Sequence, residues 1–198
     1  VSFGLGSLSS GGIVQVAHPL LDRLAQASGE LVRLSIVDED RLTWVARSQG
    51  MRQVGLRYDP DMAMEARLSC TASGHAWLMS LSDERALELV SRQGFGTPAE
   101  YGPRAPTTVK SLLGFLHAAR VRSYAIIDEV FAPGMAAMAV PVSRRKECIG
   151  VISIAGPRSR LTAARMHELG PVLLDAAGEL GPISSASTLF GRPPLGKG

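Results

Sequence analysis

The sequence lacks the features that would place the chain in a membrane or a secretory compartment. It has no run of the roughly 18 to 20 apolar residues that a membrane-spanning helix needs. The first Lys or Arg is Arg23, so the opening residues have no basic segment of the kind that begins a secretory signal. Cys70 and Cys148 are the only cysteines, too few for a disulfide framework. We therefore expect no membrane partner and a reducing, cytoplasmic location.

Charge of one sign and aromatic residues are also scarce. Among 198 residues there are 21 Lys and Arg against 18 Asp and Glu, a net charge of +3, and aromatic residues make up 5%. This excess is too small to predict a phosphate-binding surface. The basic runs at 144–146 and 158–160 contain no aromatic residues and are expected to be solvated turns. No stretch has the character of a DNA-recognition helix.

No group of catalytic or metal-binding residues stands out. Ser69, Cys70 and His75 are close in sequence, but this spacing does not by itself bring a nucleophile to a base, and a buried cysteine is the simpler interpretation. The 4 histidines are scattered, without the paired spacing of metal ligands. A glycine-rich phosphate loop is also missing. We therefore expect no enzyme, no metal and no cofactor.

What the sequence does contain is 45% hydrophobic residues, arranged in alternating strand-like and helix-like patterns. A helical pattern runs from Ile13 to a cap near Gly29, with Pro19 as a kink or the start of a second helix. Apolar and polar residues then alternate on either side of a polar turn at 38–40, which predicts a β-hairpin with one buried face. The expected strands are 32–36, 42–46, 122–127, 135–142 and 148–155, with an extended stretch at 53–58, and the further helices are 72–80, 82–93, 108–120 and 162–180.

The order of strands, helices, strands and a closing helix predicts an α+β fold with an antiparallel sheet of about six strands flanked by helices. We expect the last strands to pair with the first, so that residues 13–181 form one domain. Residues 1–12 are rich in Gly and Ser and are expected to be a linker, and residues 182–198 a flexible tail. The expected helix N-caps are Ser82, Thr108 and Thr162.

Two stretches could form a small-molecule site. At 71–76, small residues open an apolar helix, where backbone amides and the positive end of the helix dipole suit an anion. Tight packing of the helix start against the sheet is an equally good interpretation. In the last strand, Ser153 shares a face with Val151 and Ala155, and its hydroxyl could line a pocket or could equally bond within the core.

These stretches resemble the effector-binding domain of IclR-type transcriptional regulators, over residues 13–181. The opening helix from His18 and the strand entered at Glu30 look like the first elements of that family. The resemblance is specific because three further blocks occur in the family's order and spacing. They are Leu-Ser-Cys-Thr-Ala-Ser-Gly-His-Ala at 68–76, the segment 124–142 with Phe-Ala-Pro-Gly and Ala-Val-Pro-Val, and Ile-Ser-Ile-Ala-Gly-Pro at 152–157 before Arg-Leu-Thr at 160–162.

The resemblance implies a GAF/PAS-like sensor domain that binds a small effector, often an organic acid. It also implies operator DNA binding through an N-terminal winged helix-turn-helix domain absent from this chain, in a homodimer or tetramer that acts as repressor or activator. Val1 to Gly6 looks like the end of the last wing strand of such a domain. Two alternatives stay open, an enzyme on a similar scaffold and a dimerisation domain with no ligand.

The family's ligand contacts fall on six positions of this sequence. The resemblance implies that the backbone amides near Ala72 and Ser73 hold the ligand's carboxylate. Some relatives have polar groups where Ile127 and Ala137 are apolar, and His75 replaces a usual lysine. We therefore expect a larger or more apolar ligand, such as an aromatic acid, rather than a small keto acid. The implied effector-binding residues are Ala72, Ser73, Ile127, Ala137, Ser153 and Ala155.

Overall fold

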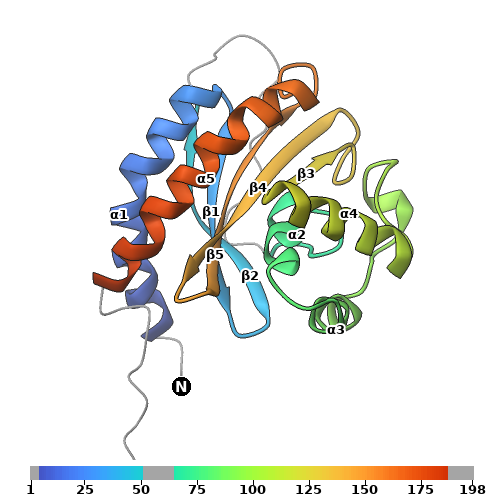
Figure 1. The fold of residues 1–198 in the computed structure, drawn as a ribbon, viewed down its shortest axis with the longest axis horizontal. Coiled ribbons are helices and arrows are strands. Elements are labelled where there is room, and N and C mark those ends of the chain that lie inside the picture. Colours follow the sequence, from blue (N-terminus) through green and yellow to red (C-terminus); the bar gives the residue numbers. More distant parts are fainter. Residues whose placement is uncertain (1–4, 51–64, 187–198) are drawn as a thin grey trace, which may run out of the picture.

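The computed structural model describes residues 5–50 and 65–186. Its strands form a single 5-stranded antiparallel sheet in the order β2-β1-β5-β4-β3, with helices on both faces (Figure 1). The α+β class is therefore confirmed, while the extended stretch expected at 53–58 lies outside the described residues. The elements are α1 (Leu5–Ser28), β1 (Leu31–Asp38), β2 (Arg41–Gln49), α2 (Ala72–Met79), α3 (Asp83–Gln93), the short 3-10 helix η1 (Pro98–Glu100), α4 (Val109–Arg122), β3 (Ala125–Asp128), β4 (Met135–Arg144), β5 (Glu147–Pro157) and α5 (Ala163–Ala186).

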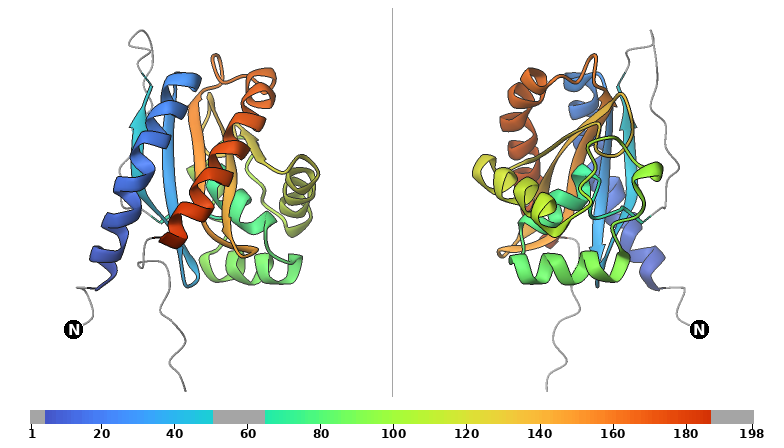
Figure 2. Two further views of the ribbon diagram at one scale, coloured as in Figure 1. Left: turned by 60° about the vertical axis from the view of Figure 1, so that its left-hand side comes forward. Right: turned by 90° about the vertical axis from the view of Figure 1, so that its right-hand side faces the viewer.

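One face of the sheet is covered by α1 and α5, which lie side by side across it (Figure 2). This face buries large aliphatic side chains, because every second residue of the central strands points towards the two helices. The strands contribute Leu34, Met138 and Ile154, and the helices contribute Leu21 and Leu173. A continuous apolar core fills the space between the sheet and this pair of helices.

The other face is covered by α2 and α4, with α3 beside α2. β1 is an interior strand because it pairs with β2 on one edge and with β5 on the other. Since helices lie on both sides of the sheet, both of its faces are covered as well. The prediction of a single buried face therefore holds for β2, whose buried residues alternate with less buried ones, but it was wrong for β1. Arg33 and Ser35, the polar residues that alternate with apolar ones along β1, are only 6% and 0% exposed. The predicted pairing of the last strands with the first is confirmed, since β5 pairs with β1.

The ends of three elements differ from the prediction. The helix α1 begins at Leu5 rather than at Ile13 and continues through Pro19, so residues 5–12 are helical rather than a flexible linker. Gly and Ser each lower helix stability by up to about 1 kcal/mol relative to Ala. They can still be helical here, because adding residues to a helix that is already formed downstream avoids the cost of starting a new one. α5 likewise continues to Ala186, past the expected start of the tail at residue 182. The strand expected from residue 122 begins at Ala125, because α4 continues to Arg122.

The predicted helix caps are confirmed. The hydroxyls of Ser82 and Thr108 each accept a hydrogen bond from the backbone amide three residues later, and Thr162 does the same at the start of α5. Gly29 ends α1 with a φ of 77° and donates its N–H to the carbonyl of Ala25. Across the described ranges, no helix combines the length and the apolar character that would be needed to span a membrane.

Candidate functional site

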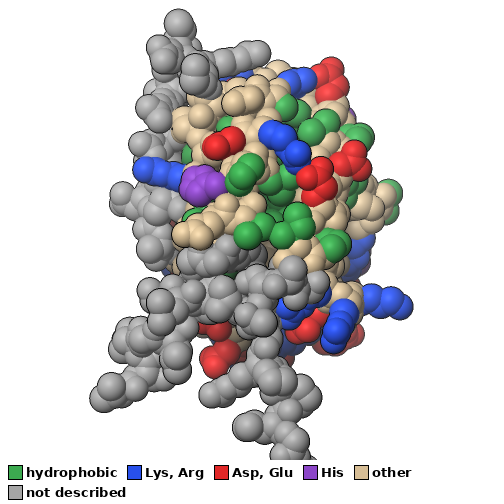
Figure 3. Space-filling model, turned by 90° about the vertical axis from the view of Figure 1, so that its left-hand side faces the viewer, with side chains coloured by type: hydrophobic (Ala, Val, Ile, Leu, Met, Phe, Trp, Pro, Cys, Tyr) green, Lys and Arg blue, Asp and Glu red, His purple; other side chains and the backbone are tan. Residues whose placement is uncertain are grey.

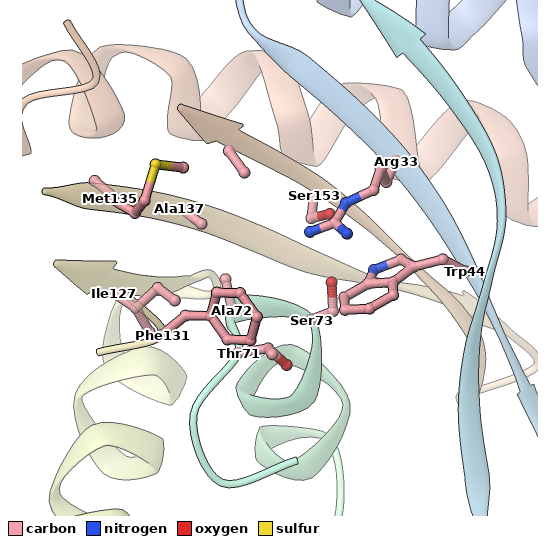
Figure 4. Close-up of a pocket in the computed structure, with 12 residues that line it drawn as sticks. Arg33, Trp44, Thr71, Ala72, Ser73, Ile127, Phe131, Met135, Ala137 and Ser153 are labelled. Carbon is pink, nitrogen blue, oxygen red and sulfur yellow. The ribbon is translucent and has the colours of Figure 1, made fainter. Parts of the chain in front are cut away.

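A cavity lies between the sheet and the start of α2 (Figure 4). The empty space between its wall atoms is about 390 Å³, a figure that includes open solvent at the mouth. All six residues that the family resemblance singled out lie on its wall: Ala72, Ser73, Ile127, Ala137, Ser153 and Ala155. The structure therefore brings together residues that are up to 83 positions apart in the sequence (155 minus 72).

The sheet register explains how these positions meet. Ala155 of β5 lies opposite Ala137 of β4, and Ala137 lies opposite Ile127 of β3. Residues directly opposite on neighbouring strands share a face, so these three side chains form one row across the sheet. In the next row Arg33 of β1 lies opposite Ser153 of β5. The small side chains of Ala137 and Ala155 leave space that larger side chains would fill.

The start of α2 forms the opposite wall. Thr71 is its N-cap, and its hydroxyl accepts a hydrogen bond from Gly74 N at 2.9 Å and donates one to Arg67 O at 2.6 Å. A Cβ on Gly74 would lie 2.5 Å from Leu68 Cα, so this glycine is required for tight packing. Ala72 and Ser73 face the cavity instead. Gly74 thus fits the packing interpretation of the small-residue stretch, and Ala72 and Ser73 stay candidates for the ligand interpretation.

Arg33 and Trp44 also line the cavity, and sequence reasoning missed both. The guanidinium carbon of Arg33 lies 3.9 Å from the centroid of the Trp44 ring, a cation–π contact. An arginine remains charged when it is buried, so Arg33 brings a positive charge to the cavity wall. The burial of Arg33 could have been inferred from the expected pairing of the first strands with the last, because that pairing makes the strand of Arg33 an interior one.

Two buried polar atoms of the cavity wall are unsatisfied. Trp44 Nε1 and Ser153 Oγ have no hydrogen-bond partner among the described residues, although the two residues are only 5% and 2% exposed. Nearly all buried polar groups in folded proteins are hydrogen-bonded. These two atoms therefore mark a place where a polar ligand group or a water molecule would be favoured. Phe131 and Met135, also missed, add apolar side chains from the segment that leads into β4.

The candidate nucleophile near this wall is not activated. Burial raises the pKa of the Cys70 thiol to about 12, so the thiolate is scarce near neutral pH. Burial also lowers the pKa of His75 to about 4, and its Nε2 lies 2.7 Å from the backbone carbonyl of Ser69 rather than beside the thiol. In the parts of the chain that the structure covers, no group of three or more His, Cys, Asp or Glu side chains could hold a metal ion.

Solved structures of other proteins share this fold. An IclR homolog from Microbacterium hydrocarbonoxydans, complexed with 4-hydroxybenzoate, superposes with a TM-score of 0.73 at 20% identity, covering 90% of this chain and 70% of that one. A double mutant of the inducer-binding domain of PobR from Acinetobacter, complexed with 3-hydroxybenzoic acid, gives 0.72 at 23% identity, covering 84% and 96%. At such identities these matches establish the fold.

The family is established by the sequence itself. The transcriptional repressor IclR of Escherichia coli (strain K12) is 28% identical over 182 residues, which cover 90% of this chain and 65% of that protein. This chain therefore spans just under two thirds of that relative's length. The model of the C-terminal region of the bacterial transcriptional regulator IclR matches residues 5–181. The predicted resemblance is thus confirmed, and the chain belongs to the family of IclR C-terminal domains.

Proposed function

We propose that this chain is the sensor region of a transcriptional regulator and that its cavity binds a small organic acid. The observation that carries the proposal is the mixed character of the cavity wall, where the buried guanidinium of Arg33 lies opposite the apolar side chains of Ile127 and Ala137. A ligand with one anionic group and an apolar body would match both parts. The six residues implied by the family resemblance take part as effector contacts in this proposal.

The anionic group is supported by two separate sources of positive potential. Arg33 carries a full charge, and the start of α2 carries the partial positive charge of a helix N-terminus beside Ala72 and Ser73. Amides in the first turn of a helix have no partners within the helix and are suited to bind a carboxylate oxygen. A carboxylate is thus favoured over a neutral or cationic group.

The apolar body is supported by the composition of the rest of the wall. Ile127, Phe131, Met135 and the two alanines of the sheet present carbon and sulfur atoms to the cavity. A single aromatic ring would bury more of this surface than a small keto acid. Two structural relatives hold 4-hydroxybenzoate and 3-hydroxybenzoic acid, which agrees with an aromatic acid as the ligand here.

In the full-length protein, we propose that ligand binding changes the affinity for operator DNA. The DNA-binding part would be a winged helix-turn-helix domain, and the coupling requires that the ligand bind two states of the regulator unequally. The support comes from the E. coli relative, which is a transcriptional repressor. Whether binding represses or activates depends on which state the ligand prefers.

Self-association into a homodimer or tetramer is a further part of the proposal. The outer surface of α1 and α5 exposes Val16, Val172 and Ile183, each more than 40% accessible. Figure 3 shows hydrophobic side chains among charged ones on the side of the molecule that carries α1. Equilibrium sedimentation should show a mass above that of one chain, and a strictly monomeric protein at micromolar concentration would contradict this part.

A thermal-shift screen of aliphatic and aromatic carboxylic acids tests the ligand proposal. A ligand present at about 100 times its Kd stabilises the folded protein by about 2.7 kcal/mol, which is a measurable shift in Tm. We expect aromatic acids to raise the Tm more than pyruvate does. S73W should abolish the shift by filling the cavity, whereas S111W, at an exposed position of α4, should leave it intact. No stabilisation by any acid at millimolar concentration would overturn the proposal.

A further inference from the structure

The cavity wall is divided into two ends of different chemistry. Figure 4 shows Arg33, Trp44, Ser73 and Ser153 grouped at one end, with the guanidinium of Arg33 directed towards Ser153. Ile127, Phe131, Met135 and Ala137 form the other end. A ligand that carries one charged and one apolar group would therefore bind in one orientation.

The strand order keeps the two ends apart. Arg33 is on β1 and Ile127 is on β3, and β5 and β4 lie between these two strands. With neighbouring strands about 4.8 Å apart, the two backbone positions are separated by roughly 14 Å across the sheet. The alanines at 137 and 155 lie on the strands between them, and their small side chains line the cavity. The polar and apolar ends of the cavity thus lie over different strands of the sheet.

The polar end has hydrogen-bonding capacity that the described protein atoms do not use. Trp44 Nε1 can only donate, and Ser153 Oγ can donate or accept, and both atoms are buried without a partner in the described residues. The guanidinium carbon of Arg33 lies over the Trp44 ring, 3.9 Å from its centroid, so the charged group is held at this end of the cavity. Donors on three side chains at one end match the oxygens of a carboxylate.

The apolar end has no comparable capacity. On the described part of the cavity wall, Thr71 and Ser73 are the hydroxyl-bearing residues near α2. The hydroxyl of Thr71 already donates to Arg67 O and accepts from Gly74 N. The side chains of Ile127, Phe131 and Ala137 contain no nitrogen or oxygen, and the thioether of Met135 is only a weak acceptor. A ligand hydroxyl placed there would lose its hydrogen bonds to water and gain none in return.

Resting on the proposed function, we propose that Arg33, Trp44 and Ser153 hold the carboxylate and that the ring points towards Phe131 and Met135. The cavity thereby selects aromatic monocarboxylates whose para position carries hydrogen, an alkyl group or a halogen, and it discriminates against a para-hydroxyl group. Arg33 is the residue that determines the selection for charge, and Ile127 contributes to the selection at the para position.

Isothermal titration with two matched ligand pairs tests this orientation on the unmodified protein. Benzoate and benzamide differ in charge but little in shape, and we expect benzoate to bind tighter by roughly tenfold or more. The second pair, 4-methylbenzoate and 4-hydroxybenzoate, differs at the para position alone, and the methyl compound should bind roughly tenfold tighter. Equal binding of benzoate and benzamide, or tighter binding of 4-hydroxybenzoate, would overturn the orientation.

Variants at Arg33 assign the charge selection to this residue. R33M should reduce benzoate affinity by roughly tenfold more than it reduces benzamide affinity, because only benzoate loses a contact between two charged groups. K110M removes one positive charge from an exposed position of α4 and should leave both affinities unchanged. A benzoate-to-benzamide ratio that is the same in R33M and in the unmodified protein would contradict the assignment. If R33M does not fold, the ligand pairs on the unmodified protein still decide the orientation.

Two variants of nearly the same shape test the para position. I127T introduces a hydroxyl at the apolar end, and I127V has the same branched shape without it. We expect I127T to raise the affinity for 4-hydroxybenzoate relative to 4-methylbenzoate by roughly tenfold over I127V. An identical ratio in both variants would place the para position elsewhere.

The outcomes separate the two levels of the proposal. If no acid binds, the proposed function fails and the orientation fails with it. If acids bind but either ligand pair fails to show the expected preference, the sensor function stands and only the orientation is overturned.

Discussion

The two faces of the sheet are built from the same strands but are packed in different ways. Towards α1 and α5 the strands present Leu34, Met138 and Ile154, which are buried in a continuous apolar core. The residues next to these three in sequence point towards α2. They are Arg33, Ala137, Ser153 and Ala155, and they line a cavity with unsatisfied polar atoms. Since successive residues of a strand point to opposite faces, one backbone supports both arrangements.

This difference suggests that stability and ligand binding are assigned to opposite faces. Close packing of large aliphatic groups contributes most of the free energy of folding. Small residues, a buried charge and an unpaired hydroxyl contribute little to that free energy and can even oppose it. If the separation holds, substitutions on one face should change unfolding without changing ligand binding, and those on the other face should do the reverse.

The largest effect on stability is expected from truncating a core residue of the helix-pair face. Leu173 of α5 is fully buried in that core, so L173A should lower the free energy of unfolding by about 3 kcal/mol, through lost apolar burial and the cavity left behind. Its neighbour Val172 is 43% exposed, and V172A should cost less than about 1 kcal/mol. Urea unfolding measures both, and equal losses would contradict the packing described for α5.

A smaller effect is expected from lowering the pH, through the buried His75 of α2. Burial lowers the pKa of this imidazole from 6.5 to about 4, so between these values the unfolded chain binds a proton that the folded protein excludes. The free energy of unfolding has its full value well above pH 6.5 and falls as the pH is lowered towards 4. The loss from this source is about 2 kcal/mol at pH 5.

Urea unfolding at pH 7 and pH 5 checks this dependence. In H75Q, which keeps a neutral donor for the carbonyl of Ser69, the difference in unfolding free energy between the two pH values should shrink by about 2 kcal/mol. The same pH dependence in H75Q and the unmodified protein would show that His75 is not the group that titrates.

A still smaller effect is expected at the cap of α2. T71V keeps the shape of Thr71 but loses the hydrogen bonds to Gly74 N and Arg67 O, and it should reduce the free energy of unfolding by about 1 kcal/mol. T71S retains the hydroxyl and should cost less. Thermal unfolding of the two variants makes the comparison, and a T71S protein that is less stable than T71V would rule out the cap as the source of the effect.

The smallest effect on stability, with the sharpest contrast to L173A, is expected at Ser153. Its hydroxyl has no hydrogen-bond partner among the described residues, so S153A should leave the free energy of unfolding unchanged within about 0.5 kcal/mol or raise it slightly. The same variant should weaken carboxylate binding. Unfolding and calorimetric titration of one preparation measure both quantities, and a large loss of stability with unchanged affinity would reverse the roles of the two faces.

Much of the fold follows from local patterns in the sequence. The caps at Ser82, Thr108 and Thr162 and the alternation along β5 could be predicted because they depend on residues within a few positions of one another. The extension of α1 back to Leu5 could not, because Gly and Ser composition indicates a linker unless the helix is already formed downstream.

The site was predictable only in part, for a related reason. The family motif identified small residues such as Ala72 and Ala155, because each lies in a short block of this sequence that resembles the family. The burial of Arg33 and its contact with Trp44 depend on β1 being paired on both sides and covered on both faces. That arrangement is set by contacts between distant segments, which the alternation within a single strand does not report.

A crystal structure of the protein with bound 4-methylbenzoate tests the central claim most directly. The account predicts one ligand between α2 and the sheet, with its carboxylate at Arg33, Trp44 and Ser153 and its methyl group beside Phe131. A ligand at another place, or one in this cavity with its carboxylate at the Phe131 end, would contradict the assignment of ligand binding to the polar end of this face.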